Sequence, residues 1–140
     1  MPTTCRYDVF ISYRHGDADE SFALDLLKKL EAAGYKVALD QRDFAPHEPF
    51  LKEMERCIKE SRFTLAVVSP RYRQSGNCEE EALITTVLDM SERRRRLIPL
   101  VIEKVEMPTW IYLVTGLDFA TPNLPFDPFG KLLRTLGNPL

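Results

Sequence analysis

The first forty residues read as a strand, a helix and a second strand, and this unit restricts the fold more than any other feature. Residues Tyr7–Tyr13 form a short, mostly apolar, β-rich run, the pattern of a central strand covered on both faces. Apolar residues then recur at helical spacing over Ser21–Ala33, and Asp17 or Asp19 can cap the start of that helix. A second strand is predicted over Tyr35–Asp40. A helix of this length can connect two parallel strands, so a βαβ unit is expected.

The remainder of the chain continues this alternation. Residues Gln41–Pro49 contain two prolines and little periodicity, which predicts a loop, and Pro49 suits the start of the following helix. That helix has one apolar face, made of Phe50, Leu51, Met54, Cys57 and Ile58. The later elements are predicted as strands over Phe63–Val68, Leu97–Ile102 and Leu117–Ala120 and helices over Glu79–Glu92 and Pro128–Leu136. Pro99 lacks a ladder donor, which indicates a bulge or a position near the sheet edge.

Alternating strands and helices predict an α/β fold with a doubly wound, flavodoxin-like, mostly parallel five-stranded sheet and helices on both faces. The 140 residues are the size of one domain, so we expect a single domain over 1–140. In such sheets, ligands bind beyond the carboxyl ends of the strands, at the point where the strand order reverses. If the strand order is 2-1-3-4-5, as in other five-stranded folds of this type, that point lies between the first and third strands. Ser12–Arg14 and Ser69–Pro70 are then expected to face one crevice.

Composition excludes several classes of protein. A formal net charge of -2 creates no overall field that would attract nucleic acid or an anionic lipid surface. No apolar run approaches the roughly 20 residues that cross a bilayer, and the first residues lack the apolar core of a secretory signal. The cysteines and histidines lack the spacing of a disulfide framework or a metal site; they are Cys5, Cys57, Cys78, His15 and His47. We therefore predict a cytoplasmic domain without a metal, a membrane or a nucleic-acid partner.

Three phosphate-binding classes that use related α/β architectures lack their motifs here. A receiver domain of two-component signalling needs paired acids after the first strand and an aspartate at the end of the third. This chain has Ser12–Arg14 and Ser69 at those places. The sequence also contains neither a GxGxxG turn after the first strand nor a GxxxxGK[ST] loop. The standard dinucleotide fold and the P-loop nucleotidases are therefore excluded, and fold alone does not decide the function.

Three segments resemble motifs of the Toll/interleukin-1 receptor (TIR) domain family. Tyr7–Arg14, with the sequence YDVFISYR, resembles the opening box of the family. Arg42–His47, RDFAPH, resembles the RDxxPG of the family's BB loop, which corresponds here to residues 41–49. The segment from Ser69 to Glu81 resembles S-x-x-[FY]…W-C-x-x-E. The three segments follow one another in the family's order and spacing.

This resemblance implies an enzyme that consumes NAD+, of the microbial type. Some TIR domains hydrolyse or cyclise NAD+ by cleaving the nicotinamide–ribose bond, and the glutamate of W-C-x-x-E is their catalytic residue. Glu81 occupies that position here. Nicotinamide leaves as a neutral pyridine and needs no general acid, so one carboxylate can suffice to stabilise the oxocarbenium-like ribosyl centre. NAD+ is thus the expected substrate, and no permanently bound cofactor is expected.

The resemblance also implies contacts with NAD+ for residues other than Glu81. Arg14 would lie near the phosphates or the ribose, and Phe44 would cover a ring by stacking. Four further residues are expected to line the same crevice: Ser12, Asp40, Asp43 and Ser69. Simpler roles stay open for three of these residues. Glu81 suits the first turn of any helix, Arg14 could be a surface cation, and Phe44 could anchor another TIR domain.

Two departures from the family motifs favour a different function. His47 stands where the BB loop has glycine, and Asn77 stands where an aromatic residue, usually tryptophan, precedes the cysteine. The alternative is a non-catalytic scaffold that recruits other TIR domains through the BB loop. In either case the resemblance implies self-association in immune or anti-phage defence signalling, with the enzyme active in the assembly. Residues Leu136–Leu140 read as a linker, so a larger parent protein with a sensing domain is expected.

Overall fold

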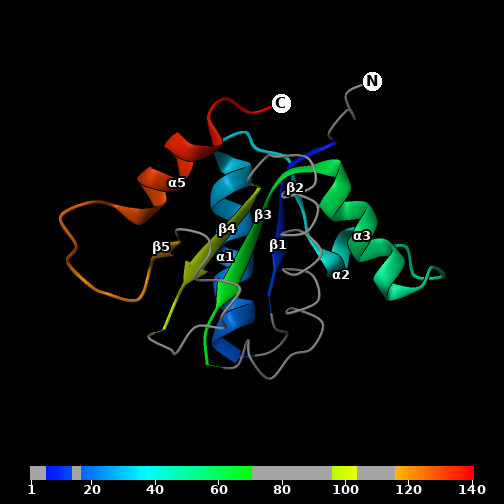
Figure 1. Ribbon diagram of the computed structural model, residues 1–140, viewed down its shortest axis with the longest axis horizontal. Helices are drawn as coiled ribbons and strands as arrows, with labels where there is room; N and C mark the ends of the chain where they lie inside the picture. Colours follow the sequence, from blue (N-terminus) through cyan, green and yellow to red (C-terminus); the bar gives the residue numbers. More distant parts are fainter. Residues whose placement is uncertain (1–5, 14–16, 71–95, 104–115) are drawn as a thin grey trace.

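The computed structural model describes residues 6–13, 17–70, 96–103 and 116–140, which form a layered α/β structure (Figure 1). The strands are β1 (Tyr7–Ser12), β2 (Val37–Ala38), β3 (Ser61–Val68), β4 (Leu97–Val101) and β5 (Leu117–Asp118). They form one five-stranded sheet in the order β2-β1-β3-β4-β5, and every strand pair is parallel. The predicted order and sheet type are confirmed. The helix predicted over 79–92 lies outside the described residues.

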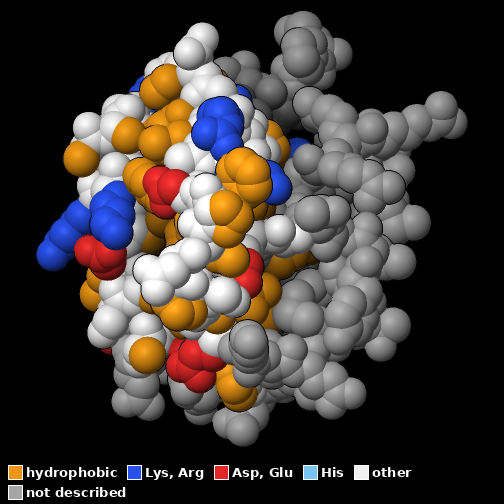
Figure 2. Space-filling view, turned by 90° about the vertical axis from the view of Figure 1, so that its left-hand side faces the viewer, with side chains coloured by type: hydrophobic (Ala, Val, Ile, Leu, Met, Phe, Trp, Pro, Cys, Tyr) orange, Lys and Arg blue, Asp and Glu red, His pale blue; other side chains and the backbone are white. Residues whose placement is uncertain are grey.

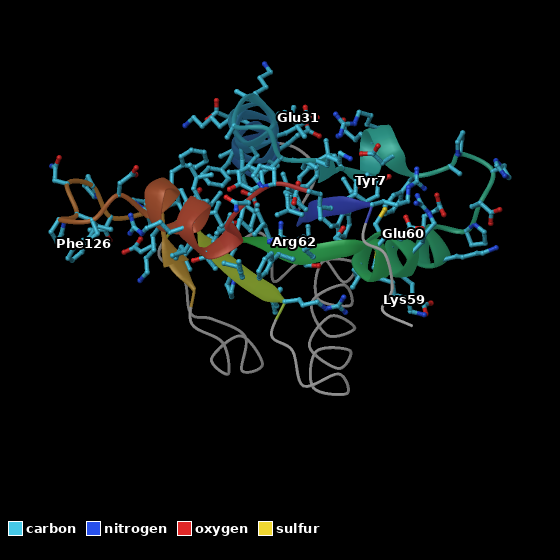
Figure 3. All side chains as sticks on the ribbon, turned by 90° about the horizontal axis from the view of Figure 1, so that it is seen from above. Tyr7, Glu31, Lys59, Glu60, Arg62 and Phe126 are labelled. Atoms are coloured by element: carbon cyan, nitrogen blue, oxygen red, sulfur yellow. The ribbon has the colours of Figure 1, made fainter. Side chains whose placement is uncertain are left out.

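Helices cover both faces of the sheet, as predicted. The helices of the described ranges are α1 (Asp17–Ala32), α2 (Asp40–Asp43), α3 (Phe50–Glu60) and α5 (Pro128–Leu136). Alternate residues of β1 point to opposite faces, because the side chains of a strand alternate. Val9 and Ile11 join the larger core with α1 and α5, whereas Phe10 joins a smaller core with Cys57 and Ile58 of α3. Figure 3 shows α1 standing on one side of the sheet.

The second strand is shorter than predicted, and a helical turn occupies part of the predicted loop. Only Val37–Ala38 is a strand, paired with β1. Backbone donors on either side are bonded to carboxylates instead: the Lys36 N–H donates to Asp8 at 2.8 Å and the Leu39 N–H donates to Asp43 at 2.7 Å. The bond to Lys36 lies before β2, and the bond to Leu39 lies where β2 ends and α2 begins. The predicted second strand is therefore confirmed, but its predicted bounds of 35–40 were too wide, and the predicted loop over 41–49 was wrong at residues 41–43, which belong to α2.

Pro99 lies inside β4, one strand from the edge strand β5. The β3–β4 register runs without a break from Thr64 opposite Leu97 to Val68 opposite Val101, so this segment contains no bulge. The Ile102 N–H donates to the Val68 carbonyl on the β3 side. Since consecutive N–H groups of a strand point to opposite sides, the donor that Pro99 lacks would point toward β5. The proline therefore leaves the β3–β4 ladder intact, and the near-edge prediction is confirmed.

Residues that follow α5 are held at the amino ends of β1 and β3. Asp8 is fully buried, and one of its oxygens accepts from Arg62 Nη1 at 2.7 Å and from the Leu140 N–H at 3.0 Å. The other oxygen accepts from the Lys36 N–H at 2.8 Å. Arg62 also donates to the carbonyl of Asn138 at 2.8 Å. This polar cluster lies at the opposite end of the sheet from the carboxyl ends of the strands.

The face that carries α5 mixes apolar, basic and acidic side chains (Figure 2). Phe126, in the segment before α5, is 73% exposed and projects from the side of the molecule away from α3 (Figure 3). None of the helices in the described ranges is long and apolar enough to cross a membrane.

Candidate functional site

The carboxyl ends of β1 and β3 lie side by side at the point where the strand order reverses. Ser12, the last residue of β1, is in register with Ala66 of β3, and Ser69 follows the end of β3. Both serines are buried. The Ser69 hydroxyl donates to Asp19 of α1 at 2.5 Å, whereas Ser12 has the strand parity of Phe10 and so faces the side of α3. The two strand ends thus meet as predicted, but their hydroxyls point to opposite faces.

Ser12 and Ser69 differ in what their hydroxyls bind. The Ser12 hydroxyl is fully buried and has no hydrogen-bond partner within the described part of the chain. An unpaired buried hydroxyl is costly, and such groups are uncommon in native structures. The Ser69 hydroxyl is committed to Asp19, whose side chain is fully buried in the first turn of α1. Within the described part of the chain, Ser12 is therefore the serine whose hydroxyl has no partner, whereas the Ser69 hydroxyl has already used its one donor.

Tyr13 ties the end of β1 to the start of the BB loop. Its side chain is 5% exposed, and its hydroxyl donates to Asp40 Oδ1 at 3.0 Å. Burial and then the negative charge of Asp40 raise the pKa of Tyr13 far above its ordinary value. The Gln41 N–H donates to the same Asp40 oxygen at 2.7 Å, and the Gln41 side chain donates to Glu20 of α1 at 2.6 Å. The sequence had assigned no such role to Tyr13.

Asp43 and Phe44, both predicted to contact NAD+, make contacts within the domain. The Asp43 carboxylate accepts from the Leu39 N–H at 2.7 Å and from Arg42 Nε at 3.2 Å. The Phe44 ring stacks on Phe10, with centroids 6.1 Å apart and planes at 23°, and is only partly buried. Phe44 also lines a hollow of about 250 Å³ together with Asp40, Gln41, Ala45, Pro46, Glu48 and Glu53.

Side chains of α3 form hydrogen bonds with the backbone of the BB loop. Glu53, whose side chain is buried, accepts from the Ala45 N–H at 2.6 Å. Arg56 donates to Glu53 and, at 3.0 Å, to the Asp43 carbonyl. The hydrogen bond from Arg56, followed by that from Ala45, lowers the pKa of Glu53. At the tip of the loop, His47 stays exposed, with Nε2 3.6 Å from a Glu48 oxygen.

The structure leaves part of the predicted site untested. Glu81 and Arg14 lie outside the described residues, as do Asn77 and Cys78, so their predicted roles stay predictions. Across residues 6–13, 17–70, 96–103 and 116–140, no group of three histidine, cysteine, aspartate or glutamate side chains is arranged to hold a metal ion.

Two buried acids, Asp19 and Glu53, were not predicted to belong to this region. Asp19 was considered only as a helix cap, and Glu53 was not singled out. Each carries a weak signal in the sequence: it is an acid among the helix positions that face the sheet. The sequence could not supply their partners, because Ser69 and Ala45 are brought to them by the fold.

A comparison with protein-family models decides the family. The model described as "TIR domain" matches residues 9–133, which is most of the chain. The chain belongs to the TIR domain family. This family membership agrees with the sheet order and with the position of the BB loop between β2 and α3.

Proteins similar to this TIR domain include receptors. It is 31% identical to mouse X-linked interleukin-1 receptor accessory protein-like 2, over 47% of this chain and 11% of that protein. The TIR domain of the Toll-related receptor TRR-2 from Hydra magnipapillata is 26% identical, with a TM-score of 0.79 over 94% of this chain and 99% of that one. A TIR-STING receptor from C. gigas, in complex with 2',3'-cGAMP, is 25% identical, with a TM-score of 0.77 over 100% of this chain and 42% of that one.

Proposed function

We propose that this TIR domain is a cytoplasmic NAD+ hydrolase or cyclase that cleaves the nicotinamide–ribose bond when copies self-associate, in immune or anti-phage defence signalling. The observation that carries the proposal is the match between motif and topology. β3 ends beside β1 at the reversal of strand order, and in the sequence the segment Ser69–Glu81, which ends in the glutamate of the family motif, begins directly after β3. The motif therefore follows the place where a doubly wound sheet binds its ligand.

The proposed reaction needs few catalytic groups. The bond between the ribose C1′ and the nicotinamide nitrogen breaks, and its electron pair leaves with the neutral pyridine. Glu81 then stabilises the positive charge that develops at C1′ and at the ring oxygen of the ribose. In hydrolysis, a water oxygen attacks C1′ and releases a proton, which gives ADP-ribose. In cyclisation, a nucleophilic atom of the adenine takes the place of water.

Described residues at the carboxyl ends of the strands support this proposal. Ser12 lies at the end of β1, directly before Tyr13 and Arg14, and its buried hydroxyl has no hydrogen-bond partner among the residues that the structure describes. Asp40 is held at a fixed distance from that strand end by the Tyr13 hydroxyl. A ribose or phosphate group in this region would thus meet polar groups whose geometry is set before binding, which lowers the entropic cost of binding.

The test compares two neighbouring glutamates. Purified domain is clustered on nickel-lipid vesicles through an added histidine tag, and nicotinamide is measured by liquid chromatography after incubation with NAD+. Glu81→Gln should abolish release, because it removes the charge that stabilises the ribosyl centre. Glu80→Gln, the matched control, should retain it. Equal rates of nicotinamide release by Glu81→Gln and Glu80→Gln would show that Glu81 is not the catalytic residue.

A second candidate function is a non-catalytic scaffold that binds other TIR domains. It is favoured by the BB loop, whose backbone is internally fixed while Pro46 and His47 stay exposed. It is also favoured by the receptor relatives, by His47 in place of glycine and by Asn77 in place of an aromatic residue.

The scaffold has its own test in light scattering of the untagged domain. Pro46→Ala should weaken concentration-dependent self-association, whereas Pro122→Ala, in another exposed segment, should leave it unchanged. Association that is insensitive to Pro46 would argue against an interface at the BB loop.

A further inference from the structure

Two side chains of α3 bind the main chain of the BB loop directly. Glu53 Oε1 accepts from the Ala45 N–H at 2.6 Å, and Arg56 Nη2 donates to the Asp43 carbonyl at 3.0 Å. The two side chains also bind one another, with Arg56 Nε 3.1 Å from Glu53 Oε2. Because both contacts on the loop are to backbone atoms, they fix the shape of the loop independently of its side chains.

Burial distinguishes this pair from an ordinary surface ion pair. The Glu53 residue is 3% exposed, and its spacing of three residues from Arg56 places both side chains on the same side of the helix. Arg56 is anchored from its other end by Glu60, whose carboxylate accepts from Arg56 Nη1 at 3.0 Å. A buried carboxylate with a cation and an N–H group as partners is much more restricted than an exposed one.

The same helix carries an ion pair of the ordinary kind, which serves as an internal control. Glu55 binds Lys59 at 2.7 Å, and the side chains of these two residues are 52% and 53% exposed. Within the described part of the chain, neither side chain of this pair binds the backbone of the loop, so charge on α3 alone does not explain the contact made by Glu53.

We propose that Glu53, supported by Arg56, is a positioning residue that clamps the BB loop in the conformation competent for NAD+ binding. Its part in catalysis rests on the proposed function, but the clamp itself does not. The clamped loop carries Asp43 and Phe44 and leads back to Asp40 beside the end of β1. A loop that populates the competent conformation for only part of the time would bind NAD+ with an affinity reduced by that fraction.

The direct test measures exchange of the Ala45 amide hydrogen by NMR. Glu53→Gln preserves side-chain size but replaces the carboxylate, which accepts from the Ala45 N–H and pairs with Arg56, by a neutral amide. We expect exchange at Ala45 to accelerate about tenfold to a hundredfold, while the core amide of Leu65 is unchanged. Glu55→Gln should accelerate neither. Unchanged exchange at Ala45 in Glu53→Gln would overturn the clamp.

The second arm measures NAD+ cleavage by the clustered domain. Glu53→Gln should raise KM at least fivefold and preserve kcat at saturating NAD+, because substrate binding then has to order the loop. A merely structural defect would lower kcat through loss of folded enzyme and leave KM unchanged; that result would overturn the positioning role. The two arms can also disagree. If exchange at Ala45 is faster in Glu53→Gln but the wild-type domain releases no nicotinamide, the clamp is supported and the proposed function is overturned.

Discussion

Replacement of Asp8 by asparagine should destabilise the domain by about 2–3 kcal/mol. Asp8 is fully buried and accepts three hydrogen bonds, at 2.7 Å from Arg62, 3.0 Å from Leu140 and 2.8 Å from Lys36. Asparagine has nearly the same shape but removes the charge and turns an N–H₂ group toward one of these donors. Loss of a hydrogen bond to a charged group costs roughly 1.5–3 kcal/mol.

The exposure of Arg62 sets the upper limit of this effect. Its side chain is 26% exposed, so water can partly solvate the guanidinium once Asp8 has lost its charge. The loss should therefore stay below the roughly 3–5 kcal/mol of a fully buried broken pair. For a domain of this size it corresponds to a fall in Tm of about 6–10 °C.

Urea unfolding followed by circular dichroism measures this effect, with the m-value expected to stay constant. Asp25→Asn is the matched control, because Asp25 also pairs with a cation, Lys29 at 3.1 Å, but its side chain is 62% exposed. The control should be indistinguishable from wild type. If Asp8→Asn shifts the midpoint no more than Asp25→Asn does, the assignment of Asp8 as a stabilising buried charge is refuted.

Three further predictions concern the core and the sheet. Tyr13→Phe removes the bond to Asp40 and should cost about 0.5–1.5 kcal/mol in urea unfolding. The raised pKa of Tyr13 stabilises the fold fully below its unfolded value, about pH 10, so wild type should lose more stability than Tyr13→Phe between pH 9 and about pH 11. Burial raises the pKa of Cys57 to about 12, so mass spectrometry should find it unmodified by iodoacetamide at neutral pH until urea unfolds the chain. Gly116→Ala places a methyl group 2.9 Å from the Pro99 carbonyl oxygen and should cost about 1–3 kcal/mol, measured in the same way.

Local patterns were sufficient to predict much of the fold. The apolar runs of β1 and β3 identify central strands, whereas the sheet order was taken from other five-stranded folds of this type. The α5 helix has the predicted bounds, and the structure shows why it begins there: Asp127 caps it by accepting from the Phe129 and Gly130 N–H groups, and Pro128 occupies its first turn. These features depend on neighbours in sequence, so the sequence contains them.

Features that depend on distant partners could not be predicted. The early end of β2 was missed for a different reason, because it follows from a local bond between the Leu39 N–H and Asp43, four residues later, which hydrophobic periodicity does not report. Asp19 reads as a helix cap until the fold brings Ser69 against it. In the candidate site, motif resemblance identified Ser12 and Asp40 at the expected end of the sheet, but it could not show that Phe44 packs on Phe10.

The proposed function is tested most directly by the release of nicotinamide from NAD+ by the wild-type domain, compared in dilute solution and clustered on vesicles. The account predicts slow release from the dilute domain and marked acceleration on clustering, with one nicotinamide formed for each NAD+ consumed. No release above a protein-free control from the clustered wild-type domain would contradict the account and leave the scaffold as the better explanation of this TIR domain.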